Sequence, residues 1–290
     1  TRQLWRMAGY NAASIGTLGI TTPDERTVTG LTTPDIVTFL SNMAGLEREG
    51  VSHVAYEASS HGLDQRRLDG VKLAAGGFTN LGRDHLDLHG TMEDYFLTKR
   101  RLFEWTDGPK LTNVDDAYGA RIVAEVPGTL GFGVSENADY RITNVHPSDG
   151  GTAFTLTTPQ RLLDGRDAPG VIDLQMPLLG DYNVHNVAGA SAIALEMGMP
   201  LDTLVDAGVP ARETLHASAC RELGDAGGDE GMVELIVTVH GSSSFQPVRW
   251  PGWLRAPHRR APACRDRGAA RGRRPDRSGG DGEVPLRLVE

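Results

Sequence analysis

Short apolar runs alternate with amphipathic helical segments over the first 199 residues of this 290-residue chain, and this alternation is the strongest constraint on its fold. Residues 51–58 and 76–80 are mostly apolar and have the length of strands buried on both faces of a parallel sheet. Helical patterns occupy residues 34–50, 91–105 and 183–197. This order predicts an α/β fold with three layers around a mostly parallel sheet.

Helix start signals and a turn motif add detail to this expectation. Thr33 precedes Pro34, which predicts a helix capped by Thr33, and Thr91 with Asp94 three residues later has the spacing of a capping box. Residues 141–156 have a shorter, strand-like period on either side of Ser148-Asp-Gly-Gly. They predict a β-hairpin that forms a small appendage to the sheet.

The composition of the chain changes after about Pro210. Residues 251–277 are rich in Arg, Pro, Gly and Ala, contain no Lys and follow neither a helical nor a strand period. We therefore divide the chain into a folded domain, residues 1–210, and a disrupted segment, residues 211–290. That segment is either a disordered basic tail or, as we favour, the out-of-frame translation of a GC-rich gene; neither supplies a packed domain.

Charge and composition narrow the class of partner. The formal net charge of -9 argues against a general affinity for nucleic acid or anionic lipid. No apolar run is long enough to span a bilayer, the first ten residues do not resemble a signal peptide, and the two cysteines have no metal-site spacing. We expect a cytoplasmic monomer that acts on a small molecule, with no nucleic-acid or membrane partner.

Polar residues cluster directly after the two apolar runs. Glu57 ends the first, and Asp84, His85 and His89 follow the second. Each of them alone is more often a salt-bridge or loop residue than a functional one. Together they predict one site, because the ligand crevice of an open α/β sheet lies at the carboxyl ends of its strands.

The same residues indicate which metal such a site would hold. Asp84, His85 and His89 are potential metal ligands, but the sequence has no HExxH motif and no second histidine cluster to complete a zinc site. With Glu57 as an oxygen ligand, Mg²⁺ held partly by phosphates fits the residues better.

Lys99 lies on the apolar stripe of the predicted helix 91–105, together with Tyr95, Phe96, Leu102 and Phe103. Two interpretations are open. The stem could pack against the core while the ammonium group reaches water. Alternatively, burial lowers the pKa of the amine and leaves a neutral nitrogen that can be chemically modified.

Several long motifs resemble the central ATPase domain of the Mur ligases, and the MurE members of that family most closely. They are Glu57-Ala-Ser-Ser-His-Gly-Leu, Phe78-Thr-Asn-Leu-Gly-Arg-Asp-His-Leu-Asp-Leu-His-Gly-Thr-Met, residues 95–103, Asn113-Val-Asp-Asp and Asn183-Val-His-Asn-Val-Ala-Gly-Ala. The resemblance covers residue 1 to about residue 210. It implies a ligase of peptidoglycan synthesis that uses ATP and Mg²⁺ to add the third amino acid, diaminopimelate or lysine, to UDP-N-acetylmuramoyl-L-alanyl-D-glutamate through an acyl phosphate. A folylpolyglutamate synthetase-like ligase and a non-catalytic substrate-binding remnant are the alternatives.

The resemblance also implies a role for individual residues. Those expected to contact the UDP-muramyl dipeptide are Thr32, Thr33, Ser59, Gln65 and Arg67. Those expected near the nucleotide are Asn80 and Asn186. Glu57, His85 and Lys99 are expected to be catalytic residues and Mg²⁺ ligands, with Lys99 carbamylated.

Two parts of the family's pattern are not found in these 290 residues. One is the Gly-x-x-Gly-Lys-Thr/Ser phosphate loop, expected just before Thr1. The other is the acceptor domain, which carries Asp-Asn-Pro-Arg in diaminopimelate-adding members. We therefore expect this chain by itself to lack ligase activity, and the choice between diaminopimelate and lysine stays open.

Overall fold

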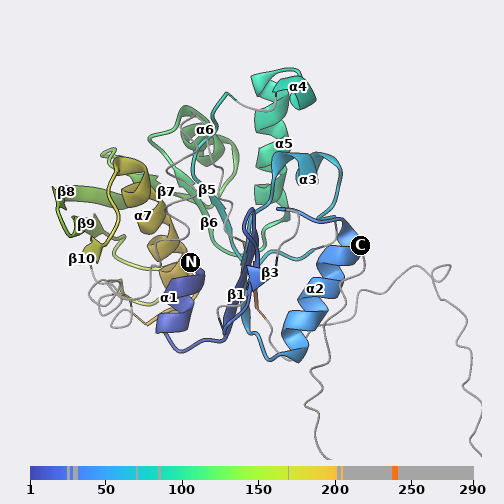
Figure 1. Ribbon diagram of the computed structural model, residues 1–290. Coiled ribbons are helices and arrows are strands. Elements are labelled where there is room, and N and C mark those ends of the chain that lie inside the picture. Colours follow the sequence, from blue (N-terminus) through green and yellow to red (C-terminus); the bar gives the residue numbers. More distant parts are fainter. Residues whose placement is uncertain are drawn as a thin grey trace, which may run out of the picture. The chain divides into compact units, whose positions relative to one another are not determined.

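The computed structural model describes residues 1–24, 27–28, 32–69, 71–83, 86–168, 170–200, 204 and 237–240. These residues form two β-sheets with helices packed against them (Figure 1). The described helices are α1 (Arg2–Met7), α2 (Ile36–Arg48), α3 (Ser60–Asp64), α4 (Leu86–His89), α5 (Met92–Trp105), α6 (Ala117–Glu125) and α7 (Asp181–Glu196). None of them is long and apolar enough to cross a membrane.

The larger sheet has six strands in the order β10-β9-β8-β7-β6-β5. Its parallel part consists of β5 (Gly76–Phe78), β6 (Lys110–Asn113), β7 (Thr129–Gly133) and β8 (Tyr140–Ser148). Strands β9 (Gly151–Thr157) and β10 (Val171–Met176) extend it in antiparallel fashion. The prediction of a mostly parallel sheet with a small β appendage is confirmed, and the predicted hairpin is the β8–β9 pair.

The second sheet has five strands in the order β11-β4-β1-β2-β3. They are β11 (Val237–His240), β4 (His53–Tyr56), β1 (Ala12–Gly16), β2 (Gly19–Thr21) and β3 (Thr27–Val28). Only β1 and β4 are parallel to each other. Strand β11 belongs to the segment that we expected to be disrupted; the rest of residues 211–290 lies outside the described part of the chain, so that expectation stays a prediction there.

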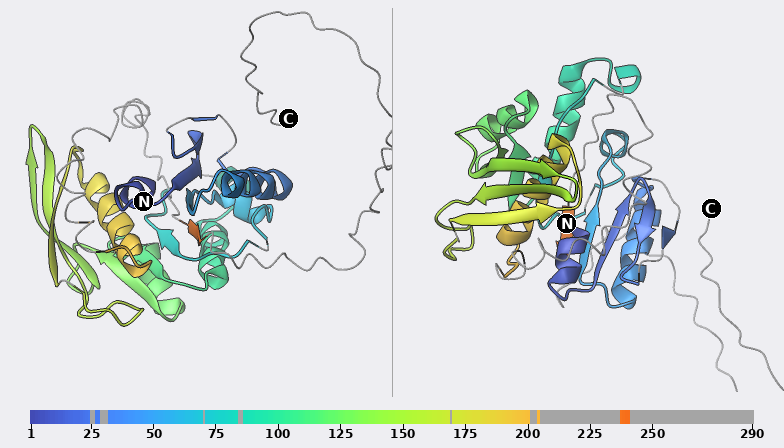
Figure 2. Two further views of the ribbon diagram at one scale, coloured as in Figure 1. Left: turned by 90° about the horizontal axis from the view of Figure 1, so that it is seen from below. Right: turned by 60° about the vertical axis from the view of Figure 1, so that its left-hand side comes forward.

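Helices cover both faces of the strands, which confirms the three-layer prediction. Ala12 and Ala13 are neighbours in β1 but belong to two different apolar clusters, because successive side chains of a strand point to opposite faces. The first cluster contains Trp5 of α1 and Val184 of α7. The second contains residues of α2, α5 and α6. In Figures 1 and 2, α7 and α2 accordingly lie on opposite sides of the strands.

The start of α2 differs from the prediction. Its N-cap is Asp35, whose carboxylate accepts hydrogen bonds from the backbone N–H groups of Val37 and Thr38. The prediction that Thr33 caps this helix is therefore wrong. Both residues are of a type that caps helices, but the Thr33 hydroxyl is engaged elsewhere, with the backbone of residues 57 and 59.

The start of α5 is as predicted, with one difference in detail. Thr91 is the N-cap, and its hydroxyl accepts a hydrogen bond from the backbone N–H of Asp94 at 3.1 Å. In a complete capping box the residue at the Asp94 position would reach back to the backbone N–H of the cap. Here the Asp94 carboxylate accepts a hydrogen bond from the Thr91 hydroxyl instead, at 2.7 Å.

Candidate active site at the carboxyl ends of the strands

Glu57 directly follows β4, beside the end of the parallel strand β1. One of its carboxylate oxygens, Oε2, accepts hydrogen bonds from the Thr17 hydroxyl at 2.9 Å and from the Thr17 backbone N–H at 3.3 Å. A Cβ atom on Gly16 would lie 3.3 Å from that oxygen. A side chain at position 16 would therefore crowd the Glu57 carboxylate slightly.

Lys99 is buried on the inner face of α5, with 3% of its surface exposed. Its ammonium group donates a hydrogen bond to the backbone carbonyl of Ala58 at 3.3 Å. Burial lowers the pKa of Lys99 to about 7, against the opposing effect of the Glu57 charge. The prediction of burial is confirmed, and the ammonium group reaches a protein carbonyl rather than bulk water.

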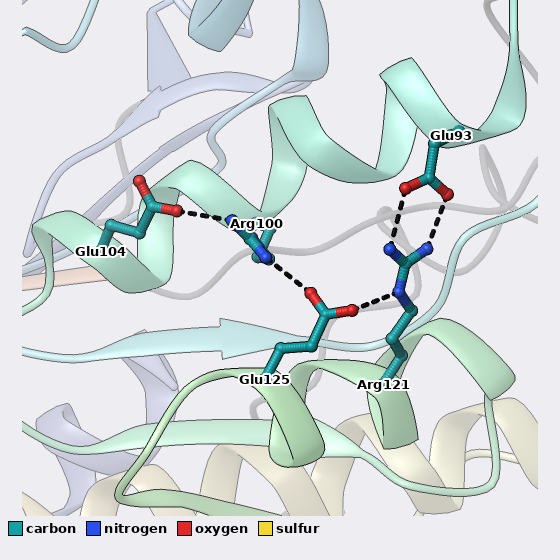
Figure 3. Close-up of polar contacts among 5 residues, drawn as sticks. All are labelled: Glu93, Arg100, Glu104, Arg121 and Glu125. Carbon is teal, nitrogen blue, oxygen red and sulfur yellow. Dashed lines mark hydrogen bonds and ion pairs between the residues drawn. The ribbon is translucent and has the colours of Figure 1, made fainter.

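The outer face of α5 is fastened to α6 by a network of ion pairs (Figure 3). Arg121 of α6 donates two parallel hydrogen bonds to the Glu93 carboxylate, at 2.6 and 2.8 Å, and its guanidinium carbon lies 4.2 Å from the centre of the Phe96 ring. Glu125 of α6 joins Arg121 to Arg100 of α5. The helix that carries Lys99 is thus held on its exposed side as well as by the core.

The residues predicted to bind the muramyl dipeptide form one hydrogen-bonded group. The Thr33 hydroxyl donates to the Glu57 carbonyl and accepts from the Ser59 backbone N–H. Arg67 donates to the Thr33 carbonyl at 2.7 Å and, through Nε and the second terminal nitrogen, to the Gln65 side-chain oxygen.

Thr32 joins the same group through a longer contact. Its hydroxyl donates to the Thr17 hydroxyl at 3.4 Å, and Thr17 in turn donates to Glu57. The structure therefore brings together all five predicted dipeptide-binding residues with Glu57, and it places Lys99 next to them through the Ala58 carbonyl.

Thr17 was missed in the sequence. It stands directly after β1 just as Glu57 stands after β4, so its position at a strand end was the signal available. The sequence did not show which strand lies beside β4, and hence could not connect Thr17 with a residue 40 positions away.

The two residues predicted to lie near the nucleotide are on other elements. Asn80 follows β5, and its side-chain oxygen is buried without a hydrogen-bond partner among the described residues. Asn186 is in the second turn of α7 and is partly exposed. No hydrogen bond between described residues joins either of them to the Glu57 group.

Asp115 ties the first turns of α7 to the ends of β6 and β7. Its carboxylate accepts hydrogen bonds from the backbone N–H groups of Val134 and Ser135, from the Ser135 hydroxyl and from the His185 ring. Burial alone would raise the pKa of Asp115, but the hydrogen bonds from Ser135, Val134 and His185 outweigh it and hold the pKa below its ordinary value. Asp115 of the Asn113-Val-Asp-Asp motif is thus bonded to His185, the chain neighbour of Asn186.

The predicted metal ligands can be followed only in part. His85 and Asp84 lie outside the described residues. Among the residues that the structure describes, no three His, Cys, Asp or Glu side chains form a metal-binding group. Of the predicted ligands, the described Glu57 supplies carboxylate oxygen atoms, which suit Mg²⁺ rather than zinc.

Comparison with known proteins identifies the family. Residues 1–194 match the model of the Mur ligase middle domain. This chain belongs to the Mur ligase family. The Mur ligase domain is 40% identical over 212 residues to the UDP-N-acetylmuramoyl-L-alanyl-D-glutamate–2,6-diaminopimelate ligase of Agrobacterium fabrum, covering 71% of this chain and 42% of the relative. A protein of the same name from Zymomonas mobilis is 42% identical over 203 residues, covering 68% and 40%.

Two further comparisons extend this result. A solved structure of a UDP-N-acetylmuramoyl-L-alanyl-D-glutamate–2,6-diaminopimelate ligase matches this Mur ligase with a TM-score of 0.59 and 30% identity, over 71% of this chain and 42% of that one. The Caulobacter vibrioides relative of the same name is 35% identical over 260 residues, which is 85% of this chain and 51% of the relative. An alignment of that length necessarily includes residues beyond residue 210. The chain spans roughly two fifths to one half of the length of these relatives.

Proposed function

We propose that the protein carrying this chain joins 2,6-diaminopimelate to UDP-N-acetylmuramoyl-L-alanyl-D-glutamate at the expense of ATP. The observation that carries the proposal is the buried Lys99 amine beside Glu57, with its pKa lowered to about 7, next to the group formed by the predicted dipeptide-binding residues. Diaminopimelate is preferred over lysine because the relatives described above are all named as diaminopimelate ligases.

Lys99 contributes a nitrogen that can change the sign of its charge. With a pKa of about 7, roughly half of the amine is neutral at neutral pH. The neutral amine attacks carbon dioxide, forms a carbamate and releases one proton. A positive group thereby becomes an anion beside the Glu57 carboxylate, and two such anions attract a divalent cation that an ammonium group would repel.

Mg²⁺ would be held by Glu57, carbamylated Lys99 and, from outside the described residues, His85, and would neutralise charge on the phosphoryl group transferred from ATP. The protein's own part is to orient the reactants. Arg67 uses three of its five N–H groups on Thr33 and Gln65, which leaves two for a substrate oxygen. The D-glutamyl carboxylate held there would accept the γ-phosphoryl group of ATP with release of ADP, and the amine of diaminopimelate would then displace inorganic phosphate from the acyl phosphate to form the amide.

Asn80 and Asn186 are proposed to lie near the nucleotide, with Asn186 at the adenine. The buried, unpaired oxygen of Asn80 supports a polar ligand at the end of β5. The hydrogen bonds of Asp115 to the ends of β7 and to α7 support a fixed position for Asn186. We further propose a cytoplasmic monomer without nucleic-acid or membrane partners, in keeping with the net charge of -9.

The experiment that tests the site uses the 290-residue chain. Incubated with ¹³C-labelled bicarbonate, it should give a carbamate carbon signal in the NMR spectrum that is absent from Lys99→Arg, since the guanidinium group does not form the carbamate. Calorimetry should detect binding of UDP-N-acetylmuramoyl-L-alanyl-D-glutamate, weakened by Arg67→Ala. Lys72→Arg is the matched control for Lys99→Arg, because Lys72 lies outside the site. A carbamate signal that persists in Lys99→Arg contradicts the proposed role of Lys99, and dipeptide binding without any carbamate favours the non-catalytic alternative.

A further inference from the structure

Thr17 occupies the central position of a three-residue hydrogen-bonded chain. The Thr32 hydroxyl donates to the Thr17 hydroxyl at 3.4 Å, and the Thr17 hydroxyl donates to Glu57 Oε2 at 2.9 Å. A hydroxyl group can accept one hydrogen bond while donating another. Thr17 therefore connects the side of the site where the dipeptide is proposed to bind with the carboxylate proposed to bind the cation.

The two donors of Thr17 act on only one of the Glu57 carboxylate oxygens. Both the hydroxyl and the backbone N–H point to Oε2. No described residue donates a hydrogen bond to Oε1, which leaves that oxygen available to a ligand. A carboxylate fixed through one oxygen has already lost most of its rotational freedom, so less entropy is lost when the other oxygen binds a cation.

The surrounding backbone brings the Glu57 side chain next to Thr17. Parallel pairing of β1 with β4 sets Ile15 beside Tyr56, so the two strands end side by side. Gly16 leaves space for the Glu57 carboxylate. The Thr33 hydroxyl holds the Glu57 main-chain carbonyl at 3.0 Å. The backbone and the side chain of Glu57 are therefore fixed by different threonines.

We propose that Thr17 is a positioning residue that fixes the Glu57 carboxylate for a divalent cation and links cation binding to the muramyl-dipeptide contact at Thr32. This inference rests on the proposed function. When the dipeptide binds and fixes the Thr32 hydroxyl, it also fixes the Thr17 hydroxyl and, through it, the Glu57 carboxylate. By thermodynamic reciprocity, the dipeptide then tightens cation binding and the cation tightens dipeptide binding by the same factor.

Mn²⁺ binding to the 290-residue chain, followed by the electron paramagnetic resonance signal of free Mn²⁺, tests the proposal without an activity assay. Thr17→Val keeps the shape of the side chain but removes the hydroxyl. It should raise the Kd for Mn²⁺ about tenfold, the low end of what a hydrogen bond to a charged group contributes. Thr17→Ser restores the hydroxyl and should bind as the wild type does. Thr143→Val, at a partly buried position of β8, controls for the loss of a threonine hydroxyl elsewhere.

The link is measured by repeating the titration with saturating UDP-N-acetylmuramoyl-L-alanyl-D-glutamate. We expect the dipeptide to lower the Kd for Mn²⁺ on the order of fivefold in the wild type and in Thr17→Ser, and to leave it unchanged in Thr17→Val. Equal urea midpoints for the three Thr17 forms show that the variants fold alike.

The outcomes separate this inference from the function on which it rests. Absence of Mn²⁺ binding by the wild type would overturn the metal site itself, and the inference with it. If Thr17→Val binds Mn²⁺ with the same Kd as the wild type, the positioning role of Thr17 is overturned but the metal site is not. If Thr17→Val binds Mn²⁺ more weakly but the dipeptide still lowers its Kd for Mn²⁺ as much as in the wild type, the link to Thr32 is overturned.

Discussion

At the scale of single residues, the site is built from groups whose partners are far apart in the sequence. The predicted position of Lys99 was confirmed because the stripe Tyr95, Phe96, Lys99, Leu102, Phe103 follows from helical spacing alone. Thr17 and the true N-cap Asp35 were not predicted. Local spacing does not reveal which hydroxyl pairs with a distant backbone group, and Thr33 is occupied by residues 57 and 59 from another strand end.

The lowered pKa of Lys99 makes the stability of the domain depend on pH. Between the folded pKa of about 7 and the unfolded pKa of 10.5, the unfolded chain binds more protons than the folded one, so Lys99 makes stability rise with pH across this window. Below about pH 7 the cost of burying the charge is fully present. In bicarbonate-free buffer, Lys99→Met should therefore be more stable than the wild type at pH 6, by up to about 5 kcal/mol.

Urea unfolding at several pH values measures this difference. The advantage of Lys99→Met should shrink from pH 7 upward and vanish near pH 10.5. Leu97→Met, on the exposed side of α5, serves as control and should show no such trend. A constant difference between Lys99→Met and the wild type across the window would contradict a lowered pKa.

At the scale of elements, helices and the hairpin were predicted from period and turn residues, whereas the pairing of strands was not. Strand β11 shows why: its residues, Val-Thr-Val-His, have the alternation of a strand, but nothing in them indicates that they pair with β4, almost two hundred positions away. The contact between α5 and α6 is likewise a tertiary feature. Their ion pairs place Glu93 and Arg121, which are 28 positions apart, in bidentate contact.

The network of Figure 3 should stabilise the domain more than an isolated surface ion pair does. Arg121 makes three hydrogen bonds to two carboxylates and covers the Phe96 ring, whereas Arg161 makes one 3.6 Å pair with the exposed Asp167. Arg121→Ala should therefore lower the thermal midpoint clearly, and Arg161→Ala should not. The Arg121 effect should be smaller in 1 M salt, because salt screens exposed charges. Equal effects of the two substitutions in calorimetry would show that the network adds nothing beyond single pairs.

At the scale of the whole molecule, the fold class and the family were predicted from the sequence, because the motifs between residues 57 and 103 are long and the strand and helix periods are clear. The division at residue 210 stays a prediction. Two observations now bear on where such a boundary would lie. Residues 237–240 pair with β4, and the Caulobacter relative aligns over 85% of the chain.

Hydrogen exchange tests whether β11 is part of the domain. Its backbone is paired with β4 from Val237–Tyr56 to His240–His53, so its amides should exchange about as slowly as those of β4. Amides of residues 251–277, which have neither a helical nor a strand period, should exchange at the rate of an unfolded chain. Fast exchange at residues 237–240 would instead put the end of the folded domain near residue 210.

Three hydrogen bonds of the site end on main-chain carbonyl oxygens, those of Thr33, Glu57 and Ala58. A side-chain substitution leaves the main-chain carbonyl oxygen of that residue in place. Mutation can therefore break these hydrogen bonds by removing the donor side chain or by shifting the backbone, but it cannot remove the acceptor. At Ala58, which is fully buried, the volume of a new side chain should therefore decide whether it is tolerated, and its hydrogen-bonding groups should matter less. In a saturation mutagenesis library, substitutions at this site should therefore be tolerated if they keep the side-chain hydrogen-bond donor or the side-chain volume. Ala58, whose carbonyl accepts the Lys99 hydrogen bond, should behave like an ordinary small core residue.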